Sequence, residues 1–500
     1  MSLIPLSGDP NIDGLLWGVR WDLNSLNYGF ATSTSQYSGY QFGSISGFQS
    51  FNGTQRAATD DVIAQLNGLF NLNIVFNANG TLANLRYAEA SSVTQYVDPN
   101  TFQPVPGAIT TAVGTPPDPF FAPDFAHGDM FFNSSDYNAP QIGNFAYATI
   151  LHETGHALGL KHGHSAQNYP DGSFVIAALP SNRDGMEFSV MTYRSEVGGA
   201  SNFYRNEQFG FAQTYMMNDI AALQYLYGAD YSTHAGQTVY SWSPTTGEMF
   251  VNGVGQGRPG ANRVFLTIWD GGGNDTYDMS GYSTDLSVNL APGNWSVLSR
   301  VQLAELNTNT GALARANVFN ALLHAGDLRS LIENATGGSG KDELRGNVAA
   351  NILLGNGSVD KLFGLVGNDR LGGGNGGDRL VGGLGGDLLI GGNGNDAFVF
   401  NAPGEGNDAI SDFSTNGAGN NDRFEFSGAS FGGLAAGALA GALFQSSNAA
   451  VAGASAIRFL FEIDTRTLRY DADGQGGSAA IIIATLQAGA QLVLNDFLIV

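Results

Sequence analysis

The sequence contains no cysteine, few basic residues and no apolar run long enough to span a membrane. The lack of cysteine excludes disulfide bonds, thiolate ligands to zinc and a cysteine nucleophile. With 21 Lys and Arg against 44 Asp and Glu, the formal net charge is −23. Such a chain repels nucleic acid and anionic membranes, and it suits hard cations such as calcium. We therefore expect neither nucleic-acid binding nor stable membrane insertion.

The N-terminus also lacks the features of a Sec signal peptide. The stretch MSLIPLSGDPNIDGLLWGVRW has no basic segment followed by a long apolar segment. A chain of 500 residues exceeds one typical domain, so two or three domains are expected. The change of composition along the chain divides it into residues 1–232, 233–400 and 401–500.

The first of these regions is predicted to be α+β. Three stretches predict helices and two predict strands: residues 55–70, 144–159 and 214–228, and residues 71–77 and 128–133, respectively. In the first helix the apolar residues recur at every fourth position: Ala58, Val62, Leu66 and Phe70. Thr54 is its predicted N-cap, and Gly159 is expected to end the second helix.

From Gly337 the chain follows a strict nine-residue period for seven units. The sixth place of each unit is acidic in six units and amide in one: Asp342, Asp360, Asp369, Asp378, Asp387 and Asp396, with Asn351 in the remaining unit. The eighth place is always apolar: Leu344, Leu353, Leu362, Leu371, Leu380, Leu389 and Phe398. This period with one inward apolar residue per unit predicts a parallel β-roll. A flexible Gly-rich linker needs neither the period nor the phased apolar residue.

The repeats also predict calcium sites. Glycine permits the tight turns, and turn carbonyls together with Asp carboxylates can enclose calcium between successive coils. The predicted ligands in the repeats are Gly338, Gly340, Asp342, Asp360, Gly364, Asp369, Gly373, Gly374, Gly376, Asp378, Gly382, Gly383, Gly385, Asp387, Gly391, Gly392, Gly394 and Asp396. Without calcium the stacked carboxylates repel each other, so we expect this region to be largely unfolded in the absence of the metal.

Four of the seven histidines lie in one stretch, LHETGHALGLKHGH, at residues 151–164. On a helix His152 and His156 share one face, and Gly159 lets the chain turn so that His162 becomes a third ligand. Three neutral nitrogen ligands suit a hydrolytic zinc ion with one position left for water. Glu153 is placed to take a proton from the attacking water rather than to bind the metal. The fourth histidine, His164, is expected to be an unused loop residue.

The stretch HETGHALGLKH resembles the zinc-binding signature of the metzincin metalloproteases, and residues 189–193, SVMTY, resemble their Met-turn. Together with the nonapeptide repeats, these motifs resemble the serralysin family. The resemblance implies a metzincin catalytic domain at residues 1–232, a calcium-binding RTX β-roll at 233–400 and a C-terminal β region at 401–500. It also implies that Tyr193 binds the resting zinc and later stabilises the transition state, with Met191 beneath the site.

Further sites follow from the same resemblance. The stretch WDGGGNDTYDMSGY adds four calcium ligands to those of the repeats: Asp270, Gly272, Gly273 and Asp275. The last five residues resemble the uncleaved signal for type I export: Asp496, Phe497, Leu498, Ile499 and Val500. On physical grounds alone, these residues could equally form a last edge strand. This chain departs from the family pattern at two places. Gly163 stands where proline is usual, and glycine there is expected to loosen the loop. Residues 296–325 form a longer connection than is usual.

The function implied is that of a zinc endopeptidase that hydrolyses extracellular proteins, with one catalytic zinc ion and several structural calcium ions. The chain is expected to be secreted from a Gram-negative cell and to act as a monomer. Its expected partners are protein and peptide substrates, the type I secretion apparatus and a periplasmic protein inhibitor. The alternative is an exported RTX adhesin or binding protein with an inactive protease domain.

Overall fold

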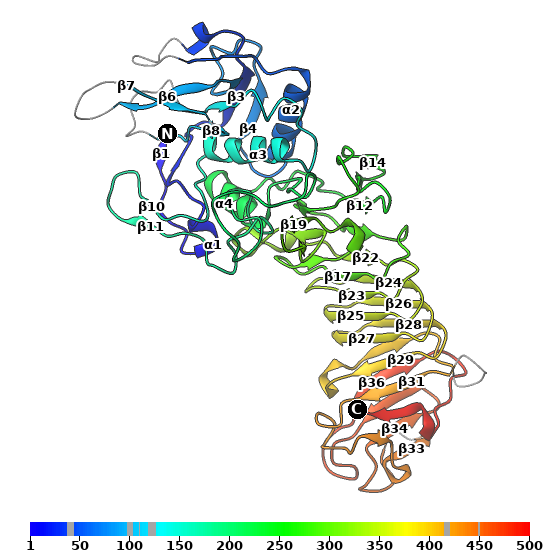
Figure 1. The fold of residues 1–500 in the computed structure, drawn as a ribbon. Helices are drawn as coiled ribbons and strands as arrows, with labels where there is room; N and C mark the ends of the chain where they lie inside the picture. Colours follow the sequence, from blue (N-terminus) through cyan, green and yellow to red (C-terminus); the bar gives the residue numbers. More distant parts are fainter. Residues whose placement is uncertain (38–44, 98–103, 110, 119–126, 415–420, 449–450) are drawn as a thin grey trace.

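The computed structural model describes residues 1–37, 45–97, 104–109, 111–118, 127–414, 421–448 and 451–500. The N-terminal part combines helices with a small sheet, and the rest of the chain is a long stack of strands that leads away from it (Figure 1). The β-rich character predicted for the C-terminal part is thereby confirmed. None of the helices in the described ranges has the length and apolar character needed to cross a bilayer.

A five-stranded sheet lies at the centre of the N-terminal part, in the order β4-β3-β5-β9-β8. Its strands are β3 (Ser25–Phe30), β4 (Asn73–Phe76), β5 (Leu85–Glu89), β8 (Ala112–Gly114) and β9 (Asp129–Phe132). Both predicted strands are therefore present, as β4 and β9. All neighbours are parallel except β8, which pairs antiparallel with β9 at the edge of the sheet. Short hairpins surround the sheet: β1 (Ser2–Leu3) with β2 (Val19–Arg20), β6 (Ser92–Val97) with β7 (Pro104–Ala108), and β10 (Gln167–Asn168) with β11 (Val175–Ile176).

The first long helix, α2 (Gly53–Asn67), begins one residue earlier than its predicted cap. The prediction of Thr54 as the N-cap is wrong, because Asn52 holds that position. The Asn52 side chain accepts from the backbone N–H groups of Thr54 and Gln55 at 2.8 and 3.0 Å. In return, the Asn52 backbone N–H donates to the Gln55 side-chain oxygen. Phe70 is buried as expected, but it lies beyond the end of the helix.

The other predicted helices are α3 (Phe145–Ala157) and α4 (Met217–Tyr227), alongside the short α1 (Pro10–Asp13). Asn144 caps the start of α3, and Gly159 follows its end with a φ of +104°, which only glycine adopts readily. The prediction that Gly159 ends this helix is confirmed. Helix α3 lies against β8 and β9, and the hydroxyl oxygen of Tyr87 in the sheet is 3.0 Å from the hydroxyl oxygen of Thr154 in the helix.

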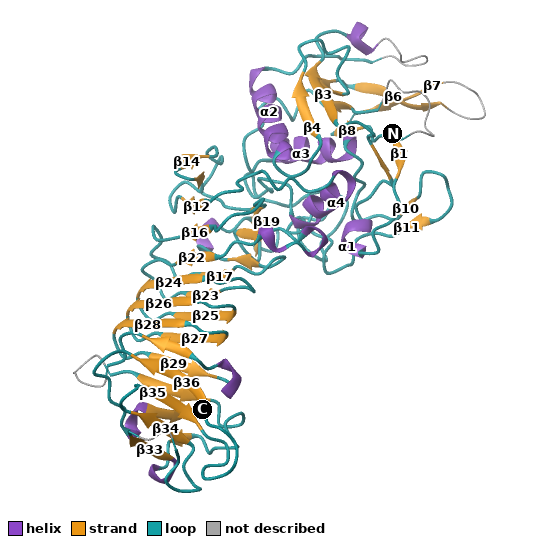
Figure 2. Ribbon diagram, turned by 180° about the vertical axis from the view of Figure 1, so that it is seen from behind, coloured by secondary structure: helices purple, strands orange, loops and turns teal. Residues whose placement is uncertain are grey.

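The nine-residue repeats build two parallel sheets that face each other, as the stacked strands of Figure 2 show. In the repeats, one sheet contains β24 (Ile352–Gly357), β26 (Arg370–Asn375) and β28 (Leu388–Asn393), and the other contains β23 (Glu343–Arg345), β25 (Lys361–Val366), β27 (Arg379–Leu384) and β29 (Ala397–Phe400). The two sheets continue after the repeats with β30 (Asp408–Ile410) and β31 (Arg423–Phe426), respectively. Ile352 pairs with Arg370 and Lys361 with Arg379, so two units form one coil of 18 residues. All seven eighth-place residues have no exposed surface, which confirms the parallel β-roll.

The same two sheets extend on both sides of the repeats. Before the repeats lie β12 (Val239–Trp242), β13 (Met249–Val251), β14 (Val254–Gly255), β16 (Thr276–Asp278), β17 (Ser287–Asn289) and β22 (Asn334–Thr336). After them lie β32 (Gly437–Ala438), β33 (Phe444–Ser447), β34 (Phe459–Glu462), β35 (Thr467–Tyr470), β36 (Ile481–Leu486) and β37 (Phe497–Ile499). The predicted edge strand at the C-terminus is an interior strand, because β37 pairs with β31 on one side and with β32 on the other.

The long connection at residues 296–325 forms short strands between the helical part and the roll. These are β18 (Trp295–Ser296), β19 (Glu305–Asn307), β20 (Ala312–Leu313) and β21 (Val318–Asn320), and β21 also pairs with β15 (Leu266–Ile268). Ala304, Leu306, Ala316 and Phe319 belong to the same hydrophobic core as helices α3 and α4. The segment is therefore packed into the N-terminal core rather than being a loose linker.

Candidate metal centre

Three histidines converge at the C-terminal end of α3. His152 and His156 are on successive turns of this helix, and the turn at Gly159 brings His162 back toward them. The Nε2 atom of His156 lies 3.1 Å from Nε2 of His152 and 3.1 Å from Nε2 of His162. The sequence-predicted ligands are thus brought together as a group that could hold one metal ion.

The hydrogen bonds of these rings fix which nitrogen faces the centre. His152 donates from Nδ1 to the Val190 carbonyl at 2.7 Å, and His156 donates from Nδ1 to the Leu160 carbonyl at 2.8 Å. Because a carbonyl only accepts, the proton is on Nδ1 and the Nε2 lone pair is free. Burial and the neighbouring imidazoles lower the pKa of His152 to about 3, and burial lowers that of His156 to about 4, so both rings are neutral.

Converging lone pairs on neutral rings repel each other unless a cation lies between them. Two zinc–nitrogen bonds of about 2.0–2.1 Å at a tetrahedral angle place their nitrogens about 3.3 Å apart. The observed separations of 3.1 Å are close to that value. The donor set and its spacing therefore fit a tetrahedral metal ion such as zinc.

Glu153 lines the same cavity as His152 but is not part of the group of three histidines. It is 5% exposed, and burial raises the pKa of its carboxyl group to about 8. A cation held by the three histidines would lower that pKa, because the opposite charge favours the carboxylate. The position is suited to a proton acceptor that gains and loses a proton near neutral pH.

The predicted Met-turn lies under the histidines. Met191 is fully buried, and a Cβ added to Gly155 of the helix would be 2.7 Å from its sulfur, so a small residue is needed there. The turn itself is held by Asp219 of α4, a residue that the sequence analysis did not single out. Asp219 accepts from the Ser189 hydroxyl at 2.6 Å and from the Val190 N–H at 2.8 Å. Because Val190 bonds His152, Asp219 orients a predicted ligand through one intermediate residue.

Tyr193 lies next to the histidines, as predicted. Its ring centroid is 4.5 Å from that of His162 and 5.6 Å from that of His152. Burial and then the Glu153 charge raise its pKa to about 12, so the hydroxyl remains a hydrogen-bond donor at neutral pH. His164 lies in a loop as expected but is not unused. Its ring stacks on Tyr193 at 4.7 Å, and its Nδ1 accepts from the Tyr193 N–H at 3.2 Å.

The loosening expected at Gly163 is absent from the structure. The Gly163 N–H donates to the Met191 carbonyl at 3.1 Å, and its own carbonyl accepts from the Leu179 N–H at 2.8 Å. A Cβ at this position would be 2.6 Å from the Leu179 side chain. Glycine therefore allows Leu179 to pack closely against the loop, and two backbone bonds fix it.

A cavity of about 580 Å³ opens beside the predicted metal ligands. His152, Glu153 and Tyr193 are on its surface. The other side chains of the lining are mainly apolar or aromatic, and they include Tyr137, Phe145, Met186, Val190, Phe203, Tyr204 and Phe211. Edge strand β8 begins close by, since Thr111, the residue just before it, also lines the cavity. The arrangement can accept a large apolar side chain next to the metal centre.

The sixth-place aspartates of the roll form two ladders. In each of them except Asp342, one carboxylate oxygen accepts from the backbone N–H of the sixth-place residue one coil earlier, at 2.7–2.8 Å. The other oxygen is buried and has no hydrogen-bond partner in the described structure for Asp275, Asp360, Asp369, Asp378, Asp387, Asp396 and Asp408. A buried, unpartnered carboxylate oxygen is costly and is the ligand type that calcium prefers.

The predicted glycines surround these unpartnered oxygens. A Cβ at Gly364, Gly373, Gly382 or Gly391 would collide with the Oδ2 of the Asp five residues later. Gly374, Gly376, Gly383, Gly385, Gly392 and Gly394 have positive φ values, as do Gly272 and Gly273. Asp342 differs from the other sixth-place aspartates because both of its oxygens accept hydrogen bonds. The Gly338 N–H donates to one oxygen and the Leu286 N–H donates to the other. Gly340 packs closely on residues 284–285, where a Cβ would not fit.

The ladders include acidic residues that the repeat analysis missed. Asp408 and Asp422 accept from the N–H groups of Asp387 and Asp396 at 2.9 and 3.0 Å. Both residues follow interruptions of the nine-residue period, so the period did not indicate them. Each nevertheless has a buried apolar residue two positions later, as the sixth-place aspartates do. At the entry of the roll, Asp270 accepts from Tyr240 and Asp275 accepts from the Thr238 N–H, both at 2.7 Å.

A sequence model of the peptidase M10 serralysin C-terminal region matches residues 229–433. The chain is 29% identical over 337 residues to the metallopeptidase AprA of Pseudomonas marginalis, a match that covers 66% of this chain and 61% of that protein. It is 30% identical over 322 residues to a serralysin of Proteus mirabilis, covering 63% and 58% of the two chains. The chain thus spans about three-fifths of the length of these relatives.

Fold and site together define a protein in which a three-histidine metal centre is joined to a parallel β-roll. The matches above confirm the resemblance to the serralysin family of metallopeptidases that was found in the sequence.

Proposed function

We propose that this chain is a secreted zinc endopeptidase that hydrolyses extracellular proteins and is stabilised by calcium. The observation that supports it most strongly is the convergence of three imidazoles beside a buried carboxyl group that lines a cavity: Nε2 of His156 lies 3.1 Å from Nε2 of His152 and 3.1 Å from Nε2 of His162. Residues 1–232 would then form a metzincin catalytic domain. The relatives named as metallopeptidase and serralysin agree with this class.

Zinc would be held by His152, His156 and His162, with Tyr193 as a ligand in the resting state. When bound, zinc polarises the scissile carbonyl and lowers the pKa of a nearby water molecule. Glu153 accepts a proton from the attacking water and later delivers it to the leaving amine. The Tyr193 hydroxyl donates a hydrogen bond to the developing oxyanion. The peptide would lie extended along the edge strand β8, with one side chain in the cavity.

The roll would bind several calcium ions through the unpartnered aspartate oxygens and the glycine turns. The four ligands at the entry of the roll, Asp270, Gly272, Gly273 and Asp275, would belong to a further site. Export by a type I apparatus would use the C-terminal residues 496–500, and a periplasmic protein inhibitor would be a further partner. In the folded chain Phe497 and Ile499 are buried in β37, so any recognition of this segment would precede folding.

The proposed function is tested with the purified full-length chain, an unfolded protein substrate such as reduced casein, and metal analysis. We expect one zinc ion per chain, cleavage at internal peptide bonds, and loss of both in His156→Ala. A chain that binds zinc and calcium but cleaves no peptide would instead support the alternative of an exported binding protein with an inactive protease domain.

Tyr193→Phe should retain zinc and the fold but lose a hydrogen-bond donor to the oxyanion. Loss of one such donor typically lowers kcat about 10²–10³-fold. Steady-state kinetics and zinc analysis measure the two quantities separately. Tyr169→Phe is the matched control, because Tyr169 is buried and its hydroxyl donates to the Ile4 carbonyl, away from the histidines. An effect of Tyr193→Phe on KM alone would assign that residue to substrate contact only.

A further inference from the structure

One wall of the cavity comes from a single irregular segment. Asn202, Phe203, Tyr204 and Phe211 all line the cavity, and residues 202–211 contain neither a helix nor a strand. Such a segment has no regular backbone hydrogen bonds of its own to hold its side chains in place. Its shape must therefore depend on contacts from the residues that lie behind it.

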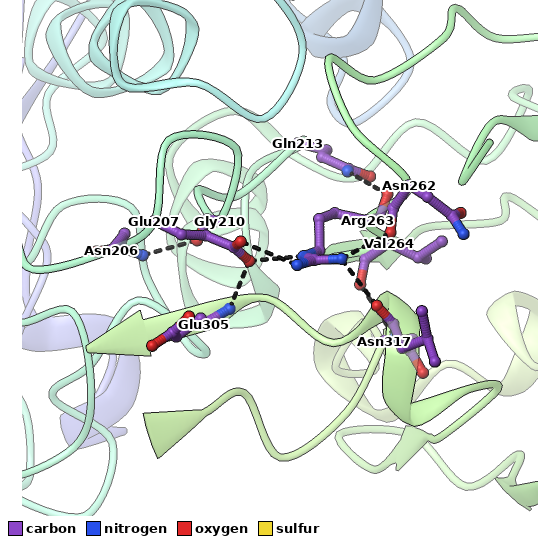
Figure 3. Close-up of polar contacts among 10 residues, drawn as sticks. Asn206, Glu207, Gly210, Gln213, Asn262, Arg263, Val264, Glu305 and Asn317 are labelled. Carbon is purple, nitrogen blue, oxygen red and sulfur yellow. Dashed lines mark hydrogen bonds and ion pairs between the residues drawn. The ribbon is translucent and has the colours of Figure 1, made fainter. Parts of the chain in front are cut away.

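One contact behind the wall is an ion pair between Glu207 and Arg263. Arg263 donates from Nε and Nη2 to the two carboxylate oxygens of Glu207, at 2.6 and 2.9 Å (Figure 3). This two-bond fork fixes both the distance and the orientation of the pair. The third nitrogen, Nη1, donates to the Val301 carbonyl at 2.8 Å. Arg263 thus joins the wall to the entry of the roll and to the long connection.

In the connection at residues 296–325, the backbone of Glu305 forms two hydrogen bonds with the same residue, Glu207. The Glu305 N–H donates to the Glu207 side chain at 2.8 Å, and the Glu207 N–H donates to the Glu305 carbonyl at 3.0 Å. Gly210 lies between them, and a Cβ there would be 2.7 Å from the Glu207 side chain and 2.8 Å from the Glu305 carbonyl. The wall is therefore packed directly against β19.

Both ends of the wall are bonded to the same region. At one end the Thr308 N–H donates to the Arg205 carbonyl at 2.9 Å. Just beyond the other end, the Gln213 side chain donates to the Arg263 carbonyl at 2.9 Å (Figure 3). The Gln213 N–H also donates to the Phe265 carbonyl at 2.9 Å. Every one of these partners follows residue 232 in the chain, beyond the segment that carries the histidines.

We propose that Glu207 and Arg263 are positioning residues that hold residues 202–211 as the wall of the substrate cavity, and that selectivity for a large apolar side chain depends on them. This inference rests on the proposed function, because it assigns the cavity to the peptide. The longer connection at 296–325 thereby has a role: it supplies Val301 and Glu305 to the support. The three histidines and Glu153 do not contact the ion pair, so removing it leaves the reacting groups in place.

The test compares Arg263→Met, Arg263→Lys and Glu207→Gln with the wild-type chain. Two peptides are used that differ only in Phe or Ala beside the scissile bond. For the Phe peptide we expect KM to rise about threefold to tenfold in Arg263→Met, the scale of one ordinary hydrogen bond, because the ion pair acts on the cavity only through the wall. Its kcat should change less than twofold, and the Ala peptide should be nearly unaffected. Arg263→Lys should recover only part of the loss, because lysine cannot form the two-bond fork.

Hydrogen exchange of residues 202–211 gives a second readout that needs no catalysis. It should be faster in Arg263→Met and in Glu207→Gln. The matched control is Arg469→Met: Arg469 and Glu462 are 23% and 16% exposed, close to the 25% and 21% of Arg263 and Glu207, but they pair at the far end of the roll. The control should change neither the kinetics nor exchange in this segment.

The outcomes separate this inference from the proposed function. A wild-type chain that cleaves no peptide contradicts the proposed function, while the exchange measurement still decides whether the ion pair holds the wall. Unchanged Phe-to-Ala selectivity in variants of an active enzyme, or unchanged exchange in residues 202–211, would overturn the positioning role.

Discussion

Glu153→Gln should lower peptide cleavage about 10²–10⁴-fold, the typical contribution of a positioned general base, while zinc content stays at the wild-type level. The amide has nearly the shape of the carboxyl group but cannot accept the proton of the attacking water. The structure supports the choice of this residue because Glu153 is 5% exposed and burial raises its pKa to about 8, within the range of a group that exchanges protons near neutrality. Steady-state kinetics with a peptide substrate and metal analysis of the same preparation measure both parts.

His156→Ala provides the comparison, since it should lose zinc and activity together. Glu153→Ala should behave like Glu153→Gln if the lost proton acceptor is the cause, and a clear difference between them would indicate a packing effect. Near-normal turnover in Glu153→Gln would show that another group accepts the proton, and the proposed mechanism would then be wrong.

The second large effect concerns the folding of the roll. In a calcium chelator at pH 8, the strands of residues 337–399 should be lost, and millimolar calcium should restore them. The reason is the series of buried Oδ2 atoms on Asp360, Asp369, Asp378, Asp387 and Asp396 that lack a hydrogen-bond partner in the described structure. Asn351 shows the contrast, because its side chain bonds Asn347 and Glu333 without any metal. Hydrogen exchange of the full chain during a calcium titration follows this region separately.

The same aspartates predict the pH dependence of the metal-free roll. Burial, followed by charge repulsion, raises the pKa of Asp360 to about 7 and those of Asp369 and Asp378 to about 6, against about 3.9 in an unfolded chain. The folded roll therefore binds protons more tightly than the unfolded chain does. Its metal-free stability is greatest below about pH 4 and is lost as pH rises through about 6–7. In a calcium chelator, the strand content measured by circular dichroism should increase as the pH is lowered from 8 to 5.

Two controls make the folding prediction specific. With saturating calcium, strand content should change little between pH 8 and pH 6, because the ion compensates the carboxylate charge. Residues 145–157 of α3, which carry no roll aspartate, should keep their exchange protection in a calcium chelator that does not remove zinc. A roll equally protected with and without calcium at pH 8 would remove the proposed link between the repeats, the metal and folding.

The periodic parts of this molecule were predictable from the sequence because their contacts repeat at fixed, short separations. A nine-residue period with an apolar eighth place determines both the 18-residue register and the burial of residues such as Leu362 and Leu380. The histidine spacing is equally local: one helical turn separates His152 from His156, and the turn at Gly159 returns His162. In each case the backbone geometry of a few consecutive residues sets the result.

Other features were decided by the tertiary structure, since they join residues far apart in the chain that no period relates. Asp219 supports the Met-turn 29 residues away, and Arg263 holds Glu207 at a separation of 56 residues. Asp408 and Asp422 join the ladders only because the chain returns to the same sheets after irregular connections. The C-terminal strand is interior because β32 folds back to cover it. The sequence by itself determined the repeating coil and the spacing of the predicted metal ligands, whereas packing between distant segments decided what orients those residues and shapes the cavity beside them.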